Sequence, residues 1–213
     1  MIAEQSTRDF RVSVRELREE SYRALRSKGY NWGHAQTASR IASQSQVLWG
    51  TGLQSIEHEC SRFIGKNRLP VSDGREKIKN RGSSFAIWGP IVASVAISHS
   101  ESVVEAGGVS CLQEFATGFW DLENTSPWTW EDGNGCKFGL DAEGNLYGTV
   151  SKSGKKVRLS VWQGFQQSTE YQLLLPFEVR KQKLRISLSE GVVVDADRWF
   201  ALKKYSWKFL VPE

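Results

Sequence analysis

The sequence predicts an α+β fold, in which an N-terminal segment of three helices is followed by a mainly antiparallel β-sheet and a C-terminal helix. Apolar residues recur at spacings of three and four through residues 1–65. From residue 136 onward, turn clusters separate runs rich in Val, Leu, Tyr and Trp, and helical spacing returns after residue 195. At 213 residues, the chain is long enough to bury a core without disulfides or metals.

The first predicted helix begins at Ser13, because Ser13 and Glu16 have the spacing of a capping box. Val12 and Leu17 flank this start with the spacing of a hydrophobic staple. Gly29 supplies the left-handed residue that ends the helix.

Two more helices follow at once. Asn31 can cap the second helix, and small residues on its inner face would let another helix approach closely. That face is predicted to hold Ala35, Ala38, Ala42, Ser45 and Trp49. Gly50 and Gly52 end the second helix, and Gly65 closes a third whose inner face is Leu53, Ile56, Cys60 and Phe63. The three helices form an N-terminal helical subdomain over residues 1–65.

Residues 66–82 are polar, basic and rich in turn residues, and we expect an exposed connection there. Residues 83–213 form a β-rich α+β subdomain, expected to make one compact unit with the helices. In KFGLDAEGNLYGTVSKSGKKVRLSVWQGF the clusters AEGN and KSGK predict turns of a meander, which YQLLLPFEV and KLRISLS continue. Asp195 or Asp197 can cap the C-terminal helix.

A cytoplasmic location is expected. The N-terminus has no apolar run behind its charges, and three cysteines spread along the chain fit a reducing compartment. They are Cys60, Cys111 and Cys136. The uncharged stretch from Gly82 to Ser100 carries five serines, a Gly-Pro pair and a histidine, which favours a buried core segment over a membrane helix.

The charge distribution carries little information on partners. Lys and Arg number 15, 1 and 12 in residues 1–100, 101–150 and 151–213, against 9, 9 and 6 acidic residues. These regions can neutralise one another within one folded chain. The basic segments GKNRLPVSDGREKIKNRG, KSGKKVR and VRKQKLR keep nucleic-acid binding as a third-ranked hypothesis, because no recognition motif accompanies them.

The two ends of the chain resemble an uncharacterised bacterial family of cytoplasmic proteins. The N-terminal signature of that family, Gly-x-x-Trp-Gly-x-Ala, is matched by Gly29, Trp32, Gly33 and Ala35. The later match comprises Gly191, Val192, Val194, Asp195, Trp199, Leu202, Val211 and Pro212. This domain of unknown function implies a fold but no chemistry.

A more distant resemblance links the N-terminal helices to the malate/L-lactate dehydrogenase family that lacks a Rossmann fold. In that family a Gly-x-x-Ser-His-Gly motif supplies a histidine for acid/base chemistry. This chain has Gly52-Leu53-Gln54-Ser55-Ile56-Glu57, so Ser55 matches but Ile56 replaces the histidine and cannot transfer a proton. His58 lies about 200° around a helix from Ile56 and cannot simply take over. We therefore interpret this corner as a helical joint, and the sequence leaves open whether it lines a pocket.

The candidate catalytic residues are Ser55, His58 and His99. His99 follows an apolar run and could act as a base, although a histidine there is more often only hydrogen-bonded. Trp128 and Trp130, in the Pro- and Gly-rich SPWTWEDGNG, are candidate ligand-binding residues, with packing against the sheet as the alternative. Trp32 of the N-terminal signature joins them.

No metal site is predicted. HECSR resembles the start of a zinc motif, but Arg62 occupies the position of the second histidine. Asp132-Gly-Asn-Gly and Asp141-Ala-Glu-Gly-Asn resemble calcium loops without the distal Glu, so hairpin turns explain them better.

Three functions remain open at this stage. The first is a role in small-molecule metabolism, as an enzyme with an unrecognised site or as a ligand-binding accessory subunit, with a small organic acid as the expected ligand. The second is a non-catalytic module that binds a partner protein, and the third is nucleic-acid binding. The residues identify no cofactor, do not decide whether the chain is an enzyme, and leave the oligomeric state open.

Overall fold

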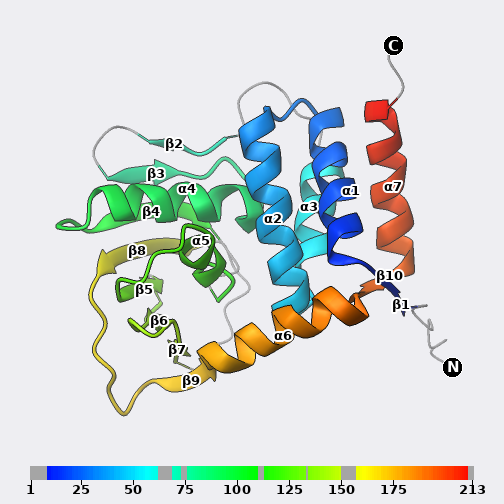
Figure 1. Cartoon of the computed structure of the whole chain (residues 1–213). Helices are drawn as coiled ribbons and strands as arrows, with labels where there is room; N and C mark the ends of the chain where they lie inside the picture. The colour runs from blue at the N-terminus through cyan, green and yellow to red at the C-terminus, as the bar shows by residue number, and fades with distance from the viewer. Residues whose placement is uncertain are drawn as a thin grey trace, which may run out of the picture. The chain divides into compact units, whose positions relative to one another are not determined.

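The computed structural model describes residues 9–61, 69–72, 76–109, 113–132, 134–149 and 157–210. It has the predicted α+β fold, and the chain forms two compact units (Figure 1). The first unit comprises Met1–Phe63 and Lys183–Glu213, and the second comprises Ile64–Gln182. The C-terminal helix thus belongs to the same unit as the N-terminal helices, and the sequence-based boundaries at residues 65 and 82 stay a prediction.

The first unit is a helical bundle. Its helices are α1 (Val14–Ser27), α2 (Trp32–Trp49), α3 (Gly52–Ser61) and α7 (Ala196–Leu210). Figure 1 shows α1 running beside α2 and α7. The three predicted N-terminal helices are confirmed, and apolar residues of all four helices fill the core between them.

The predicted ends of the first two helices are also confirmed, whereas Phe63 and Gly65 of the third lie outside the described residues. The Ser13 hydroxyl accepts a hydrogen bond from the Glu16 amide at 3.0 Å, and the Asn31 side chain accepts one from the His34 amide at 2.8 Å. Gly29 and Gly50 adopt left-handed φ angles of 86° and 73° at the ends of α1 and α2.

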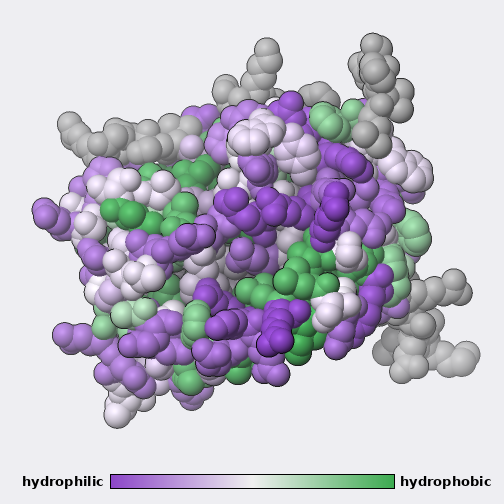
Figure 2. Space-filling view, viewed as in Figure 1, coloured by the Kyte–Doolittle hydropathy of each residue, from purple (hydrophilic) through white to green (hydrophobic). Residues whose placement is uncertain are grey.

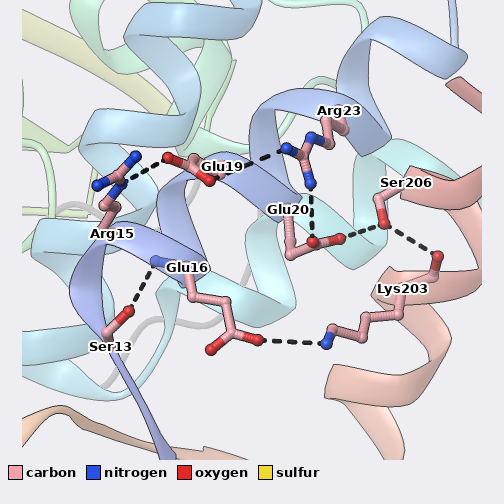
Figure 3. A network of polar contacts seen from close by, with 8 residues as sticks. All are labelled: Ser13, Arg15, Glu16, Glu19, Glu20, Arg23, Lys203 and Ser206. Atoms are coloured by element: carbon pink, nitrogen blue, oxygen red, sulfur yellow. Dashed lines mark hydrogen bonds and ion pairs between the residues drawn. The ribbon is translucent and has the colours of Figure 1, made fainter. Parts of the chain in front are cut away.

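Two short strands and a polar network attach α7 to the bundle. β1 (Asp9–Val12) pairs antiparallel with β10 (Val192–Asp195), and the Asp195 carboxylate accepts a hydrogen bond from the Arg198 amide at 2.9 Å. Figure 3 shows the buried Glu20 carboxylate of α1 accepting hydrogen bonds from Ser206 of α7 and from Arg23. This network fixes the position of α7 on α1.

The second unit contains a mixed sheet in the order β2-β3-β4-β8-β5-β6-β7-β9, in which β3 and β4 are the one parallel pair among the described strands. Its strands are β2 (Val71–Ser72), β3 (Lys77–Lys79), β4 (Val104–Val109), β5 (Trp128–Asp132), β6 (Lys137–Leu140), β7 (Leu146–Gly148), β8 (Val157–Gln163) and β9 (Gln172–Leu175). The AEGN turn is confirmed, with Gly144 at a φ of 87°, whereas KSGK lies outside the described residues.

Helices α4 (Phe85–Ser98) and α5 (Ala116–Asp121) also belong to the second unit. They pack around an aromatic core that includes Trp88, Phe115, Phe119, Trp128 and Trp130. The uncharged stretch of the sequence is thus the buried α4, with Pro90 inside the helix. Within the described part of the chain, every helix is too short or too polar to span a bilayer.

The end of the predicted meander is wrong: YQLLLPFEV forms a strand only over Gln172–Leu175, and its last three residues are helical. The alternation of Leu184, Ile186 and Leu188 in KLRISLS predicted a strand, but these residues lie in helix α6 (Phe177–Glu190). Good helix formers, mainly Lys, Arg, Gln and Leu, fill most of this segment. Only Ser187 of α6 is buried, so the helix is exposed on most sides and has no inner face of apolar residues to mark it.

Candidate functional site

The candidate site is an open groove of about 650 Å³ within the first unit, between α1 and α2. Helix α1 contributes Arg15, Arg18, Glu19, Tyr22 and Arg23, whose spacings of three and four place them on one side of the helix. Helix α2 contributes Trp32, Gln36 and Ser39 at the same kind of spacing. Val14 and Leu188 complete the lining. The volume lies within the range of small-molecule sites in proteins.

The groove carries a positive charge, because three arginines face one carboxylate. Arg15 Nε lies 2.8 Å from Glu19 Oε1, and Arg23 reaches Glu19 at 3.9 Å and Glu20 at 3.2 Å (Figure 3). The hydrogen bond from Arg15 lowers the pKa of Glu19, so this carboxylate stays ionised at neutral pH. Glu19 therefore offsets the charge of Arg15, Glu20 pairs with Arg23, and the charge of Arg18 is left over.

Arg18 is the guanidinium that is open to a ligand. It is exposed and lies between Arg15 and Tyr22 on the side of α1 that faces the groove. None of the ion pairs among the described residues involves Arg18. A guanidinium can donate two parallel hydrogen bonds to a carboxylate, which makes Arg18 the natural anchor for an organic acid.

Aromatic and apolar surface surrounds these charges. Trp32 is the first residue of α2 and 62% exposed, and half-buried Tyr22 lines the same groove. In Figure 2, hydrophilic side chains gather over α1, and an apolar area lies below them over the C-terminal part of α6. The groove can thus hold a molecule with both an anionic group and an apolar body.

The groove is better suited to binding than to proton transfer. Among its described lining residues, Glu19 is the one carboxylate, and its lowered pKa makes it a poor proton donor. The Ser39 hydroxyl donates a hydrogen bond to the Gln36 carbonyl oxygen at 2.9 Å, within its own helix. Positioned cations and apolar surface are what the lining residues offer.

Of the residues singled out in the sequence, Trp32 is the one that lines this groove. The arginines were missed, although their signal was present: the positions 15, 18, 19, 22 and 23 follow the helical period with a polar residue at each. Such a pattern is typical of a solvated helix face, and only the neighbouring α2 turns it into one wall of a groove.

Ser55 and His58 lie three residues apart on α3, hence on adjacent positions of one side of that helix. Ser55 is buried, and its hydroxyl donates to the Thr51 carbonyl oxygen at 3.4 Å. His58 is half-buried, and its carbonyl oxygen accepts a hydrogen bond from Ser61. The structure thus places both side chains on the same helix turn.

The corner before Ser55 is a tightly packed joint between α2 and α3. A Cβ atom at Gly52 would overlap the carbonyl oxygen of Ala42, so only glycine allows this approach of the two helices. The Gln46 side chain accepts a hydrogen bond from the Leu53 amide at 2.9 Å and donates one to the Val193 carbonyl oxygen at 3.0 Å. Gln46 thereby links the start of α3 to β10.

The remaining candidates lie in the second unit. His99 is exposed at the C-terminal end of α4, where its Nδ1 lies 3.1 Å from the Val95 carbonyl oxygen. Trp128 and Trp130 were expected in a loop, but they lie in strand β5 and are buried, with the Trp128 ring stacked on Phe119 at 4.8 Å. A ligand would have to enter the core to stack on either ring.

Metal binding has little support among the described residues. No group of three or more His, Cys, Asp and Glu side chains converges among them as a metal site would require. Cys60 and Cys136 are both buried, and burial raises the pKa of the Cys60 thiol to about 12, which keeps it protonated. Cys111 and Arg62 lie outside the described residues.

The turns and basic segments singled out in the sequence have ordinary structural roles where they are described. Asp132 accepts hydrogen bonds from the amides of Asn134 and Cys136, and Asp141 accepts one from the amide of Asn145, so both carboxylates stabilise turns. VRKQKLR lies on α6, KSGKKVR falls mostly outside the described residues, and GKNRLPVSDGREKIKNRG does so in part.

Comparison with known proteins shows a shared fold. Malate dehydrogenase from Entamoeba histolytica superimposes with a TM-score of 0.69 at 8% identity, over 97% of this chain and 99% of that chain. Malate dehydrogenase from Pyrococcus horikoshii OT3 gives 0.61 at 9% identity over 96% and 97%. Sulfolactate dehydrogenase from Methanocaldococcus jannaschii gives 0.57 at 9% identity over 95% and 98%. These likenesses agree with the distant resemblance of the N-terminal helices to the malate/L-lactate dehydrogenase family.

No known protein-family profile matches the chain. No curated protein sequence matches it either. The resemblance of the two chain ends to an uncharacterised bacterial family therefore stays a prediction.

Proposed function

We propose that this chain acts in small-molecule metabolism by binding a small organic acid in the groove between α1 and α2. The observation that carries the proposal is Arg18, an exposed guanidinium without an ion pair among the described residues, placed in a groove of ligand size beside aromatic side chains. Carboxylates are the anions whose planar geometry matches such a side chain. In this role the chain would be a ligand-binding protein or accessory subunit.

The test is isothermal titration calorimetry of the whole chain with a panel of carboxylates and their neutral amides. The acids are expected to bind and the amides are not. Arg18→Gln should weaken binding of the acids about tenfold or more, because a hydrogen-bonded charge pair is lost. Lys204→Gln is the matched control, since it removes one exposed positive charge of α7 outside the groove. Equal affinity in Arg18→Gln and the control would contradict the proposal.

A second candidate function is catalysis on a small acid, which the fold shared with dehydrogenases favours. Ser55 and His58 on α3 would then supply the hydroxyl and the imidazole for proton transfer, and His99 at the end of α4 is the separate candidate base of the second unit. A spectrophotometric assay with nicotinamide cofactors and a panel of hydroxy and oxo acids tests this role. Turnover that His58→Gln abolishes would support it, and absence of turnover across the panel would argue for binding alone.

A further inference from the structure

We propose that the ligand of the groove is an aromatic monocarboxylate, an acid whose ring is joined to its carboxylate by two or three carbons. This inference rests on the proposed function, because it names the class of acid that the same groove selects. Three features of the groove carry it. They are the number of arginines available to a ligand, the presence of aromatic side chains, and the helical spacing between Arg18 and Tyr22.

The charge available to the ligand is one. Arg15 is held by Glu19 at 2.8 Å, and Arg23 is shared between Glu19 and the buried Glu20 (Figure 3). A dianion or a polyphosphate would need a second guanidinium, which would have to be drawn from the ion pairs of Glu19 and Glu20. A single carboxylate on Arg18 leaves these pairs intact.

The apolar part of the ligand is expected to be a ring. Trp32 and Tyr22 line the groove together with Arg18, and Trp32 exposes most of its surface. An exposed indole gives a flat face on which a ligand ring can stack, and ring stacking is favoured over contact with an aliphatic group of the same size. Gln36 lies one helical turn beyond Trp32 and offers its amide to a polar substituent.

Helix geometry sets the length of the ligand. Arg18 and Tyr22 are four residues apart on α1, which corresponds to about 6 Å along the helix axis. An acid whose ring is two or three carbon atoms from its carboxylate matches this rise, with the carboxylate at Arg18 and the ring beside Tyr22. Short acids without a ring can reach the guanidinium but leave the indole uncovered.

The test is calorimetry of the whole chain with phenylpropionate, cyclohexylpropionate, phenylpropionamide and succinate. Phenylpropionate is expected to bind most tightly. Trp32→Ala should weaken its binding about tenfold, whereas Trp32→Phe should restore most of the affinity. Trp207→Ala is the matched control, because Trp207 is 60% exposed on α7 and lies outside the groove.

The outcomes separate this inference from the proposed function. If succinate binds as tightly as phenylpropionate, or if Trp32→Ala has no effect while Arg18→Gln does, the groove binds acids without selecting a ring and the inference is overturned. If no carboxylate binds, the inference and the proposed function both fail. Tight binding of phenylpropionamide would show that the ring binds without a carboxylate on Arg18. That result would overturn the inference that the ligand is a monocarboxylate.

Discussion

The groove of the first unit and the aromatic core of the second use the same side chains in opposite environments. In the core, Trp130 is fully buried and packs against the rings of Phe115, Phe119 and Phe138 with centroid distances of 5.4 to 6.0 Å. In the groove, Trp32 stands at the start of α2 beside arginines and exposes most of its surface. The residue type is the same, and only the neighbours differ.

The comparison shows that the residue type alone does not identify a site. A tryptophan surrounded by rings stabilises the fold, whereas a tryptophan beside an available cation is placed to contact a ligand. If this distinction holds, substitutions in the two regions separate stability from binding. The following experiments test that separation.

The largest expected effect is on the core. Trp130→Ala removes a fully buried ring and should lower the free energy of unfolding by about 3–5 kcal/mol, measured by urea denaturation. Trp32→Ala, the matched substitution in the groove, should change it by less than about 0.5 kcal/mol. Comparable losses in both variants would show that Trp32 is a packing residue, and the comparison would fail.

A second test compares two glycines of the helical unit, one in tight contact at the corner between α2 and α3 and one without a tight contact. Gly52→Ala should cost about 1–3 kcal/mol or more in the free energy of unfolding, because the new Cβ overlaps the Ala42 carbonyl group and the helices must move apart. Gly33→Ala, in the first turn of α2, meets no tight contact and should be neutral or slightly stabilising. Equal unfolding midpoints for both variants would contradict the tight packing of α2 against α3 at Gly52.

The sequence predicted the helical unit better than the sheet unit, for a physical reason. Ser13, Gly29 and Asn31 act through residues within one turn of their own position, so each signal lies within a few letters of the sequence. Helix α4 was not predicted as a helix, because a segment that is buried on nearly all sides shows no periodicity. Its helical state depends on the sheet and on α5.

The groove could be predicted only in part. The sequence singled out Trp32, and the helical spacing of the arginines on α1 was visible but typical of any solvated face. What makes them a site is α2, whose Gln36 and Ser39 form the opposite wall. Helix pairing is a long-range property, and no local pattern around Arg18 specifies it.

A pH experiment tests the buried interior of the helical unit. Burial raises the pKa of the Cys60 thiol to about 12, above its ordinary value of 9.0. The folded state therefore holds this proton where the unfolded state has released it, so stability should fall as the pH rises above 9.0. We expect a loss of more than about 1 kcal/mol per pH unit, measured by urea denaturation.

Cys60→Ala is the control for this experiment, because lysine and tyrosine groups titrate in the same range. The difference between the two proteins isolates the thiol. Parallel stability curves for Cys60→Ala and the unaltered protein between about pH 9 and pH 11 would show that the thiol is not held in its neutral form by burial.

The smallest effect on stability is expected from Glu19→Gln. This substitution tests whether a change in the groove can alter binding and leave the fold unaffected. Glu19 is half-buried on the surface and pairs with Arg15 within one helix, so denaturation curves should be unchanged within error. Binding should change, because Arg15 loses its carboxylate partner and becomes available to a ligand. Calorimetry should show several-fold tighter binding of succinate and a smaller gain for phenylpropionate. An equal gain in affinity for both acids would mean that Glu19 sets only the overall charge of the groove. A gain in affinity for succinate alone would identify Glu19 as the residue that selects for a single negative charge.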